Sequence, residues 1–160
     1  IGIAGGAEKC KWLTEELGFS AAIDYKAESV ADRLASLCKN GIDVFFDNVG
    51  GQILDDVLLN LKVGGRIALC GGISSGYGKA NLPPGPQNYM QLVIRRALMQ
   101  GFLVLDYTEE FPTALAEIAS WIDSSELKVK ESFAEGIASC PLALQGLFRG
   151  ENIGKQLVRV

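Results

Sequence analysis

Glycine clusters follow three of the short apolar runs in this sequence, and their positions make them candidates for holding a ligand. Glycine lets the backbone approach a ligand closely and adopt positive φ angles. In an open α/β sheet, ligands bind outside the carboxyl ends of the strands. Any one cluster could serve only to turn the chain from a strand into a helix, but three at one sheet edge favour a binding crevice. The clusters lie at residues 5–6, 47–51 and 70–74.

Lys9 and Tyr25 could recognise a phosphate at this edge. Lys9 falls in the first turn of a predicted helix, where a cation opposes the helix dipole and a bound phosphate would reverse that effect. In dinucleotide-binding folds, an acid at the strand tip binds a ribose hydroxyl, whereas a cation accommodates a 2′-phosphate. Here the tip is Gly5-Gly6, followed by Lys9. Such a fold would favour NADP(H) over NAD(H), with Tyr25 stacking on or hydrogen-bonding the same end. The alternatives are a solvated lysine and a packed surface aromatic.

Asn48, Tyr77 and Tyr89 are the remaining polar candidates. Asn48 precedes a predicted helix, so it is either the N-cap of that helix or a residue whose amide binds a ribose or carboxamide. Tyr77 and Tyr89 could donate a proton or orient a substrate, because a chain without His leaves tyrosine as the natural acid. A purely structural role is the alternative for each of them.

The composition excludes several classes of function. The chain has 160 residues, 48% of them hydrophobic and 21% charged, which is typical of a soluble globular protein. A net charge of −4 argues against a nucleic-acid-binding surface, which needs concentrated Lys and Arg. The absence of His excludes Ser-His-Asp and Cys-His nucleophilic sites and His zinc sites. The 4 cysteines form no C-x-x-C pair, so they are interpreted as buried free thiols of a cytoplasmic protein. No apolar run reaches the roughly 18 residues that a membrane span needs.

Short apolar runs alternate with helical patterns along the chain, and this predicts a parallel sheet covered by helices. A Gly/Pro/Ser-rich segment at 71–86 interrupts the alternation, and loops of that length usually carry function. Ser29 is the expected N-cap of the second helix and Pro141 the opening of the last one. The predicted strands are 1–4, 21–23, 42–46, 66–70, 101–105, 128–133 and 155–160, and the predicted helices are 7–17, 29–38, 51–61, 87–98, 108–122 and a short one from 141.

One expected feature of a nucleotide-binding fold is missing. No G-x-G-x-x-G stands between a strand and a helix in this chain, which is the main objection to a dinucleotide site. The fingerprint would normally follow a strand just upstream of Ile1.

Six ordered motifs nevertheless resemble one family along the whole chain, the zinc-independent medium-chain dehydrogenase/reductases. The branch that they resemble contains the prostaglandin reductases (leukotriene B4 12-hydroxydehydrogenases) and the alkenal and curcumin double-bond reductases. The motifs are Ala-Gly-Gly-Ala-Glu-Lys-Cys at 4–10, Phe-Asp-Asn-Val-Gly-Gly at 46–51, Gly-Arg-Ile-Ala-Leu-Cys-Gly-Gly-Ile-Ser at 65–74, Leu-Pro-Pro-Gly-Pro at 82–86, Met-Gln-Gly-Phe at 99–102 and Gly-Glu-Asn-Ile-Gly-Lys at 150–155.

The resemblance implies an NADPH-dependent reduction of the C=C bond of α,β-unsaturated ketones and aldehydes. Hydride passes from the nicotinamide to the β-carbon, and the resulting enolate is protonated at the α-carbon. Lys9 resembles the ligand of the 2′-phosphate, and Asn152 the late residue that reaches back to the cofactor. The cofactor-binding residues implied in this way are Lys9, Tyr25, Asn48, Cys70, Gly71, Gly72, Ile73, Ser74, Ser75, Gly76, Phe102, Leu103, Val104 and Asn152.

This sequence departs from the family's pattern at two places that concern the candidate proton donors Tyr77 and Tyr89. The family's Ile-Ser-x-Tyr loop has an extra residue here, so Tyr77 need not point as its counterpart does. Some members place a Tyr where this chain has Ile94, which leaves Tyr89 as the substitute.

Family members are much longer than this chain, and this shapes the expected domain organisation. The fold class expected is α/β, a Rossmann-like doubly wound parallel sheet that is incomplete, its first strand and glycine-rich loop being absent. Residues 1–127 would form a partial dinucleotide-binding domain, and 128–160 a tail that belongs to a GroES-like catalytic domain. The resemblance also implies a homodimer through the 101–105 edge. The competing hypothesis is a non-catalytic module that acts through oligomer or partner binding, and a weaker one is another Rossmann-like enzyme such as a methyltransferase.

Overall fold

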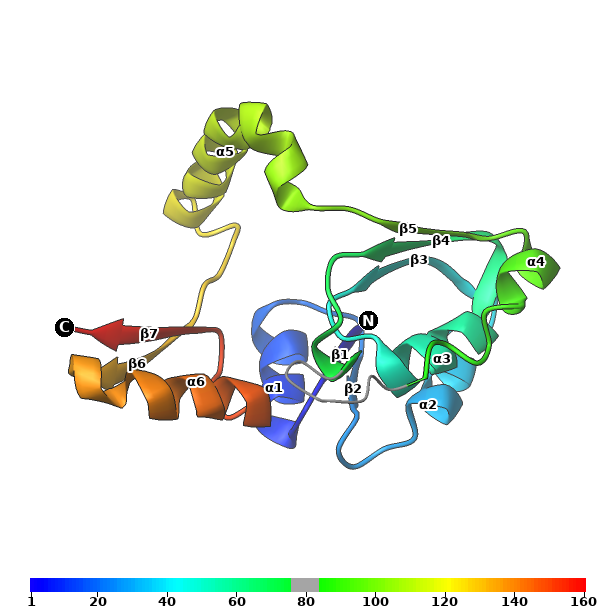
Figure 1. Cartoon of the computed structure of the whole chain (residues 1–160), viewed down its shortest axis with the longest axis horizontal. Helices are drawn as coiled ribbons and strands as arrows, with labels where there is room; N and C mark the ends of the chain where they lie inside the picture. Colours follow the sequence, from blue (N-terminus) through cyan, green and yellow to red (C-terminus); the bar gives the residue numbers. More distant parts are fainter. Residues whose placement is uncertain (76–83) are drawn as a thin grey trace. The chain divides into compact units, whose positions relative to one another are not determined.

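The computed structural model describes residues 1–75 and 84–160, which divide into two compact units. Unit 1 consists of residues 1–26 and 109–160, and unit 2 of residues 27–108. Figure 1 labels the helices and strands of both units.

The first part of unit 1 is a strand–helix–strand segment. Strand β1 pairs with β2 in parallel, Gly2 opposite Ala22 and Ala4 opposite Asp24. Helix α1 and the π-helical turn η1 connect the two strands, and Ile23 of β2 is fully buried. The elements are β1 (Gly2–Ala4), α1 (Ala7–Lys11), η1 (Trp12–Glu16) and β2 (Ala22–Asp24).

The second part of unit 1 is the C-terminal segment. Strands β6 and β7 form another parallel pair, and α6 lies between them in the sequence. Pro141 stands in the first turn of α6, and Gly150 ends the helix in the left-handed conformation. The elements are η3 (Val104–Glu110, which begins in unit 2), α5 (Phe111–Asp123), β6 (Glu131–Glu135), η4 (Ile137–Ser139), α6 (Cys140–Arg149) and β7 (Lys155–Arg159).

Unit 2 is a three-stranded parallel sheet in the order β3-β4-β5, with α2 and α3 packed together beside it (Figure 1). The Ser29 hydroxyl accepts the Asp32 N–H at 3.3 Å and so caps α2 as expected. The elements are α2 (Val30–Leu37), β3 (Ile42–Asp47), α3 (Gly51–Leu59), β4 (Leu61–Leu69), η2 (Ile73–Ser75), α4 (Gln91–Arg95) and β5 (Leu98–Gly101).

The core of unit 2 lies between its helices and the central strand. Apolar positions three and four apart turn one face of each helix toward that core. Val44 and Phe46, which share one face of β3, remain 69% and 56% exposed. The buried apolar residues are Val30 and Leu34 of α2, Leu54, Val57 and Leu58 of α3, and Leu61 and Ile67 of β4.

The parallel α/β class expected from the sequence is confirmed, and several expected boundaries are wrong. Every strand pair in the described residues is parallel, but the strands form three separate sheets. Strand β4 was expected to begin at Arg66, after a turn at Gly64-Gly65, but it begins at Leu61 and includes both glycines. The pairing with β3 continues across them because its register shifts between Ile42 and Val44. Strand β5 ends where the expected strand begins, at Gly101, and α4 covers only five residues of the expected helix.

The described residues bear on two expectations from the sequence, the absence of a membrane span and the state of the cysteines. None of their helices is both long and apolar enough to cross a membrane. All four cysteines are free, as expected, but Cys70 is exposed and the other three are half-buried, so their expected burial is wrong.

Candidate functional site

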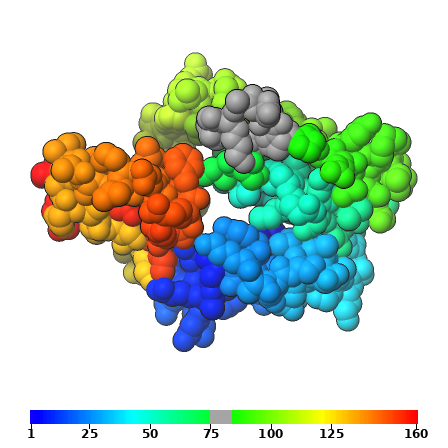
Figure 2. All heavy atoms as spheres, turned by 60° about the horizontal axis from the view of Figure 1, so that its bottom comes forward, coloured from blue at the N-terminus to red at the C-terminus, as the bar shows by residue number. Residues whose placement is uncertain are grey.

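Lys9, Tyr25 and Lys26 converge on Gly150 within unit 1. The Lys9 Nζ donates a hydrogen bond of 2.6 Å to the Gly150 carbonyl, and the Lys26 Nζ donates one of 3.3 Å to the Arg149 carbonyl. A Cβ placed on Gly150 would lie 3.6 Å from the Lys9 Nζ, 3.9 Å from the Lys26 Nζ and 4.0 Å from the Tyr25 hydroxyl. In Figure 2 the N-terminal residues lie beside the end of α6. Two ammonium groups and a phenol therefore lie around a single point. We call Lys9, Tyr25, Lys26 and Gly150 the lysine cluster.

The ends of β1 and β2 hold the lysine cluster in place. One Asp24 carboxylate oxygen accepts the Gly6 N–H at 2.8 Å and the Lys26 N–H at 3.0 Å, which joins the two strand ends. A Cβ on Gly5 would approach the Tyr25 ring and the Lys26 Cε to 2.9 Å. Glycine at that position therefore allows both side chains to lie over the end of β1.

The electrostatics at the end of α6 favour cations. Carbonyls at a helix C-terminus carry partial negative charge, so they stabilise the two ammonium groups. Arg149 and Glu151 form a two-point ion pair at 2.6 and 3.3 Å. The hydrogen bond from Arg149 holds the pKa of Glu151 below its ordinary value, and the nearby Lys26 charge adds to that lowering. Arg149 is thus the main partner of Glu151, and Lys26 contributes to a smaller extent.

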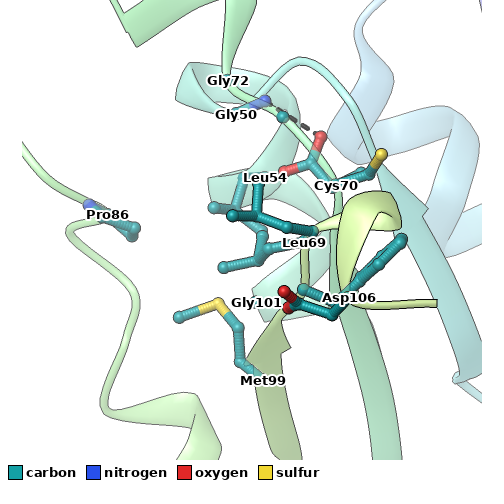
Figure 3. Close-up of a pocket in the computed structure, with 13 residues that line it drawn as sticks. Gly50, Leu54, Leu69, Cys70, Gly72, Pro86, Met99, Gly101 and Asp106 are labelled. Atoms are coloured by element: carbon teal, nitrogen blue, oxygen red, sulfur yellow. Dashed lines mark hydrogen bonds between the residues drawn. The ribbon is translucent and has the colours of Figure 1, made fainter. Parts of the chain in front are cut away.

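Unit 2 has a pocket of about 610 Å³ at the carboxyl ends of β3, β4 and β5. Figure 3 shows the side chains of Leu54, Leu69 and Met99 on one side of it and Pro86 on the other. The wall is thus largely apolar, with backbone polar groups at the glycines. The lining residues are Asp47, Gly50, Leu54, Leu69, Cys70, Gly71, Gly72, Pro86, Met99, Gly101, Phe102, Leu103 and Asp106.

Asp47 organises the loop at one end of this pocket. Its side chain is 1% exposed, and Oδ1 accepts the N–H groups of Val49 and Gly50 at 2.8 and 2.9 Å (Figure 3 marks the second). Its Oδ2 is buried with no hydrogen-bond partner among the residues that the structure describes. The carboxylate therefore holds the loop that precedes α3 and does not cap the helix. Helix α3 has Gly50 as its N-cap and no side-chain cap, so the N-cap interpretation of Asn48 is wrong.

Hydrogen bonds between strand-end loops fix the first part of the 70–75 segment. The N–H groups of Cys70 and Gly71 donate to the Asp47 carbonyl at 2.8 and 3.1 Å, and the Ile73 N–H donates to the Asn48 carbonyl at 3.2 Å. A Cβ on Gly71 would come within 3.3 Å of the Asn48 carbonyl, so glycine permits this close approach.

Phe102 is positioned from both sides at the end of β5. Its ring lies 6.0 Å from that of Phe46 and 6.5 Å from that of Tyr107, centroid to centroid. Its N–H donates to the Leu69 carbonyl at 3.2 Å, which continues the sheet pattern by one residue.

The site residues expected from the sequence fall into four groups. Lys9 and Tyr25 belong to the lysine cluster, and Asn152 follows Gly150 by two residues, its amide donating to the Gly154 carbonyl at 2.6 Å. Cys70, Gly71, Gly72, Phe102 and Leu103 line the pocket of unit 2. Asn48, Ile73, Ser74, Ser75, Val104 and Tyr89 are described but are not among its lining residues, and Tyr89 is 56% exposed. Gly76 and Tyr77 lie outside the described residues.

Sequence reasoning missed Lys26, Gly150 and the apolar wall of the pocket. Lys26 follows Tyr25 directly, so a cation at the strand end was a usable signal. Gly150 gave none, because its contact with Lys9 spans 141 residues. Leu54 and Met99 looked like ordinary core positions.

The donors present fit a phosphorylated dinucleotide. Two lysines and a tyrosine around one point suit a phosphate, and glycine loops at strand ends suit a nucleotide backbone. Within residues 1–75 and 84–160, no three His, Cys, Asp or Glu residues come together where they could hold a metal ion.

Parallel strands with glycine-rich loops at their carboxyl ends place the chain in the α/β class, in which such loops commonly bind nucleotides. A family model described as zinc-binding dehydrogenase matches residues 1–120, and the chain belongs to that family.

Several relatives match the chain over its full length. The NADPH-dependent curcumin reductase of Escherichia coli is 38% identical over all of this chain and 48% of its own length. The NADP⁺-dependent 2-alkenal reductase of Nicotiana tabacum is 42% identical over all of this chain and 46% of its own. The crystal structure of Vibrio vulnificus CurA in complex with NADPH matches 99% of this chain and 48% of that one, with 41% identity and a TM-score of 0.89. The chain spans about half the length of the relatives it matches.

Proposed function

We propose that the protein containing this chain is an NADPH-dependent reductase of the C=C bond in α,β-unsaturated ketones and aldehydes. The observation that carries the proposal is the convergence of Lys9 and Tyr25 beside Gly150, which suits the 2′-phosphate that distinguishes NADPH from NADH. The similarity to reductases of curcumin and 2-alkenals supports the substrate class.

In this proposal the chain's residues bind and orient, and the cofactor supplies the hydride. Lys9 and Tyr25 bind the adenosine end, and the backbone from Phe102 to Val104 borders the nicotinamide. The apolar side chains of Leu54, Leu69 and Met99 would exclude water from the reacting end, which strengthens electrostatic interactions there. Tyr77 and Tyr89 stay predicted proton donors for the α-carbon.

The test compares two cofactors on the whole protein. With a 2-alkenal or curcumin as substrate, we expect NADPH oxidation, followed at the nicotinamide absorbance, to run at least about tenfold faster than NADH oxidation at low cofactor concentration. The reason is that one charge-assisted contact to the phosphate is worth about 1.5 to 3 kcal/mol, or roughly 10-fold to 100-fold. Equal rates would contradict the proposed phosphate site, and no binding of either nucleotide would favour the non-catalytic module.

We propose further that the protein acts without zinc, in the cytoplasm. The free cysteines support a reducing compartment. The proposed transfer of hydride from NADPH to an enone does not require a metal ion.

A domain division at residue 127 is also proposed, with 128–160 packing against a further, GroES-like domain. Large apolar side chains of this segment are exposed, which supports a covering partner. They include Ile137 at 73%, Leu142 at 67% and Phe148 at 61%.

A homodimer through the edge of β5 is the proposed assembly. Strand β5 pairs only with β4 among the described strands, and the residues that follow it, Leu103 and Leu105, are 64% and 67% exposed. We expect sedimentation of the whole protein to give a dimer mass, and Leu105→Asp to give a monomer because a carboxylate cannot be buried there without a partner. A monomeric wild-type protein would contradict this assembly.

A further inference from the structure

Lys26 is the one member of the lysine cluster that the proposed function does not need, and its geometry suggests a role. It is an exposed side chain directly after Tyr25, yet its Nζ lies beside Gly150, 3.9 Å from the position of a Cβ there, against 3.6 Å for the Lys9 Nζ. Its aliphatic part also lies against the end of β1, since a Cβ on Gly5 would come within 2.9 Å of its Cε. The side chain is therefore folded toward Lys9.

The structural contacts of Lys26, with the Arg149 carbonyl and with the charge of Glu151, stabilise this conformation only modestly. Ordering an exposed lysine costs rotamer entropy. Its described hydrogen bond, to the Arg149 carbonyl, is 3.3 Å long and exposed, so its net contribution is small. Bringing Lys26 near the like charge of Lys9 adds repulsion that an anion would reverse.

The charges around the point favour an anionic ligand. Lys9 and Lys26 supply two positive charges, and the only carboxylate beside Lys26 in the end of α6, Glu151, is paired with Arg149 at 2.6 Å. Asp24, at the end of β2, directs one carboxylate oxygen to backbone N–H groups at 2.8 and 3.0 Å. The two lysines outnumber this one further carboxylate, and a phosphate monoester, with a charge of about −1.5 to −2 at neutral pH, would be attracted to them.

We propose that Lys26 is a second specificity-determining cation for the 2′-phosphate, acting with Lys9 and Tyr25. The carbonyls of Arg149 and Gly150 hold the two ammonium groups at the end of α6, and Gly5 leaves the space in which Lys26 turns back. The inference rests on the proposed function, because it concerns the same phosphate.

The test measures nucleotide binding to the whole protein by calorimetry and needs no catalysis. The probes are adenosine 2′,5′-bisphosphate, which carries the 2′-phosphate, and 5′-AMP, which lacks it. For Lys26→Gln we expect the first to bind about tenfold more weakly and the second within about twofold of wild type, since one exposed charge contact is lost. Lys26→Arg should restore most of the affinity. Lys11→Gln is the matched control, because Lys11 is exposed on the same surface helix as Lys9 and pairs with Glu15 at 3.7 Å.

The possible outcomes separate this inference from the proposed function. If the wild-type protein binds both probes equally, the 2′-phosphate site itself is wrong, and the inference with it. If the wild type prefers the bisphosphate and Lys26→Gln keeps that preference, only the role of Lys26 is overturned. An equal loss for both probes would show a structural role and would also overturn it.

Discussion

Replacing Lys9 with glutamine is expected to weaken NADPH binding to the whole protein about 30-fold while NADH binding changes little. Lys9 is half-buried, and its Nζ makes the shorter contact of the lysine cluster, 2.6 Å to the Gly150 carbonyl. A hydrogen bond to a charged group contributes about 2 kcal/mol, which corresponds to about 30-fold in affinity. The expected effect exceeds that of Lys26, whose contact is longer and exposed. Fluorescence titration of both nucleotides gives the two dissociation constants.

The selectivity ratio separates a phosphate contact from damage to the fold. Lys9 also ties α1 to the end of α6, so its loss could loosen unit 1. Such loosening would weaken NADPH and NADH together, and thermal unfolding would report it directly. Parallel losses for the two nucleotides would therefore contradict the assignment of Lys9 to the 2′-phosphate. The Lys11→Gln variant should leave both dissociation constants unchanged.

Local sequence patterns were sufficient for most of the elements and for part of the lysine cluster. The parallel strands, the Ser29 cap and the Pro141 helix start follow from periodicity and capping chemistry, which act over a few residues. Lys9 and Tyr25 could be predicted because each stands next to a strand end. Lys26 joins the cluster through a contact with the Arg149 carbonyl, 123 residues away. Such pairing depends on where the end of α6 meets the strand ends, and no local pattern encodes it.

The errors at strand ends have a common physical cause. The backbone hydrogen bonds at a strand end depend on the partner strand, so the strand propensities of single residues predict the ends of strands poorly. Strand β4 extends through two glycines because β3 pairs with it on either side of a register shift. In the same way, Asn48 looked like a cap by residue type, but α3 begins only after Gly50 and no side chain caps it. The buried carboxylate of Asp47 binds the N–H groups of Val49 and Gly50 in the loop before the helix.

Replacing Asp47 with alanine is expected to lower the free energy of unfolding by about 3 kcal/mol, because the Val49 and Gly50 N–H groups lose their acceptor and each unsatisfied buried donor costs about 1 to 3 kcal/mol. Those two bonds hold the loop that leads into α3. The same residue's carbonyl receives the N–H groups of Cys70 and Gly71, so the pocket loop should loosen as well. Urea unfolding of the whole protein measures the loss, and nucleotide titration measures the effect on the pocket.

Two variants of β3 test why Asp47 matters. Asp47→Asn keeps an acceptor oxygen for both N–H groups, so we expect it to lose less than about 1 kcal/mol. Asp43→Ala removes an exposed carboxylate from the same strand, whose partner Lys62 lies at 2.8 Å on the surface, and such pairs contribute about 0 to 1 kcal/mol. If alanine and asparagine at position 47 destabilise equally, the negative charge and not the acceptor geometry is what the loop requires.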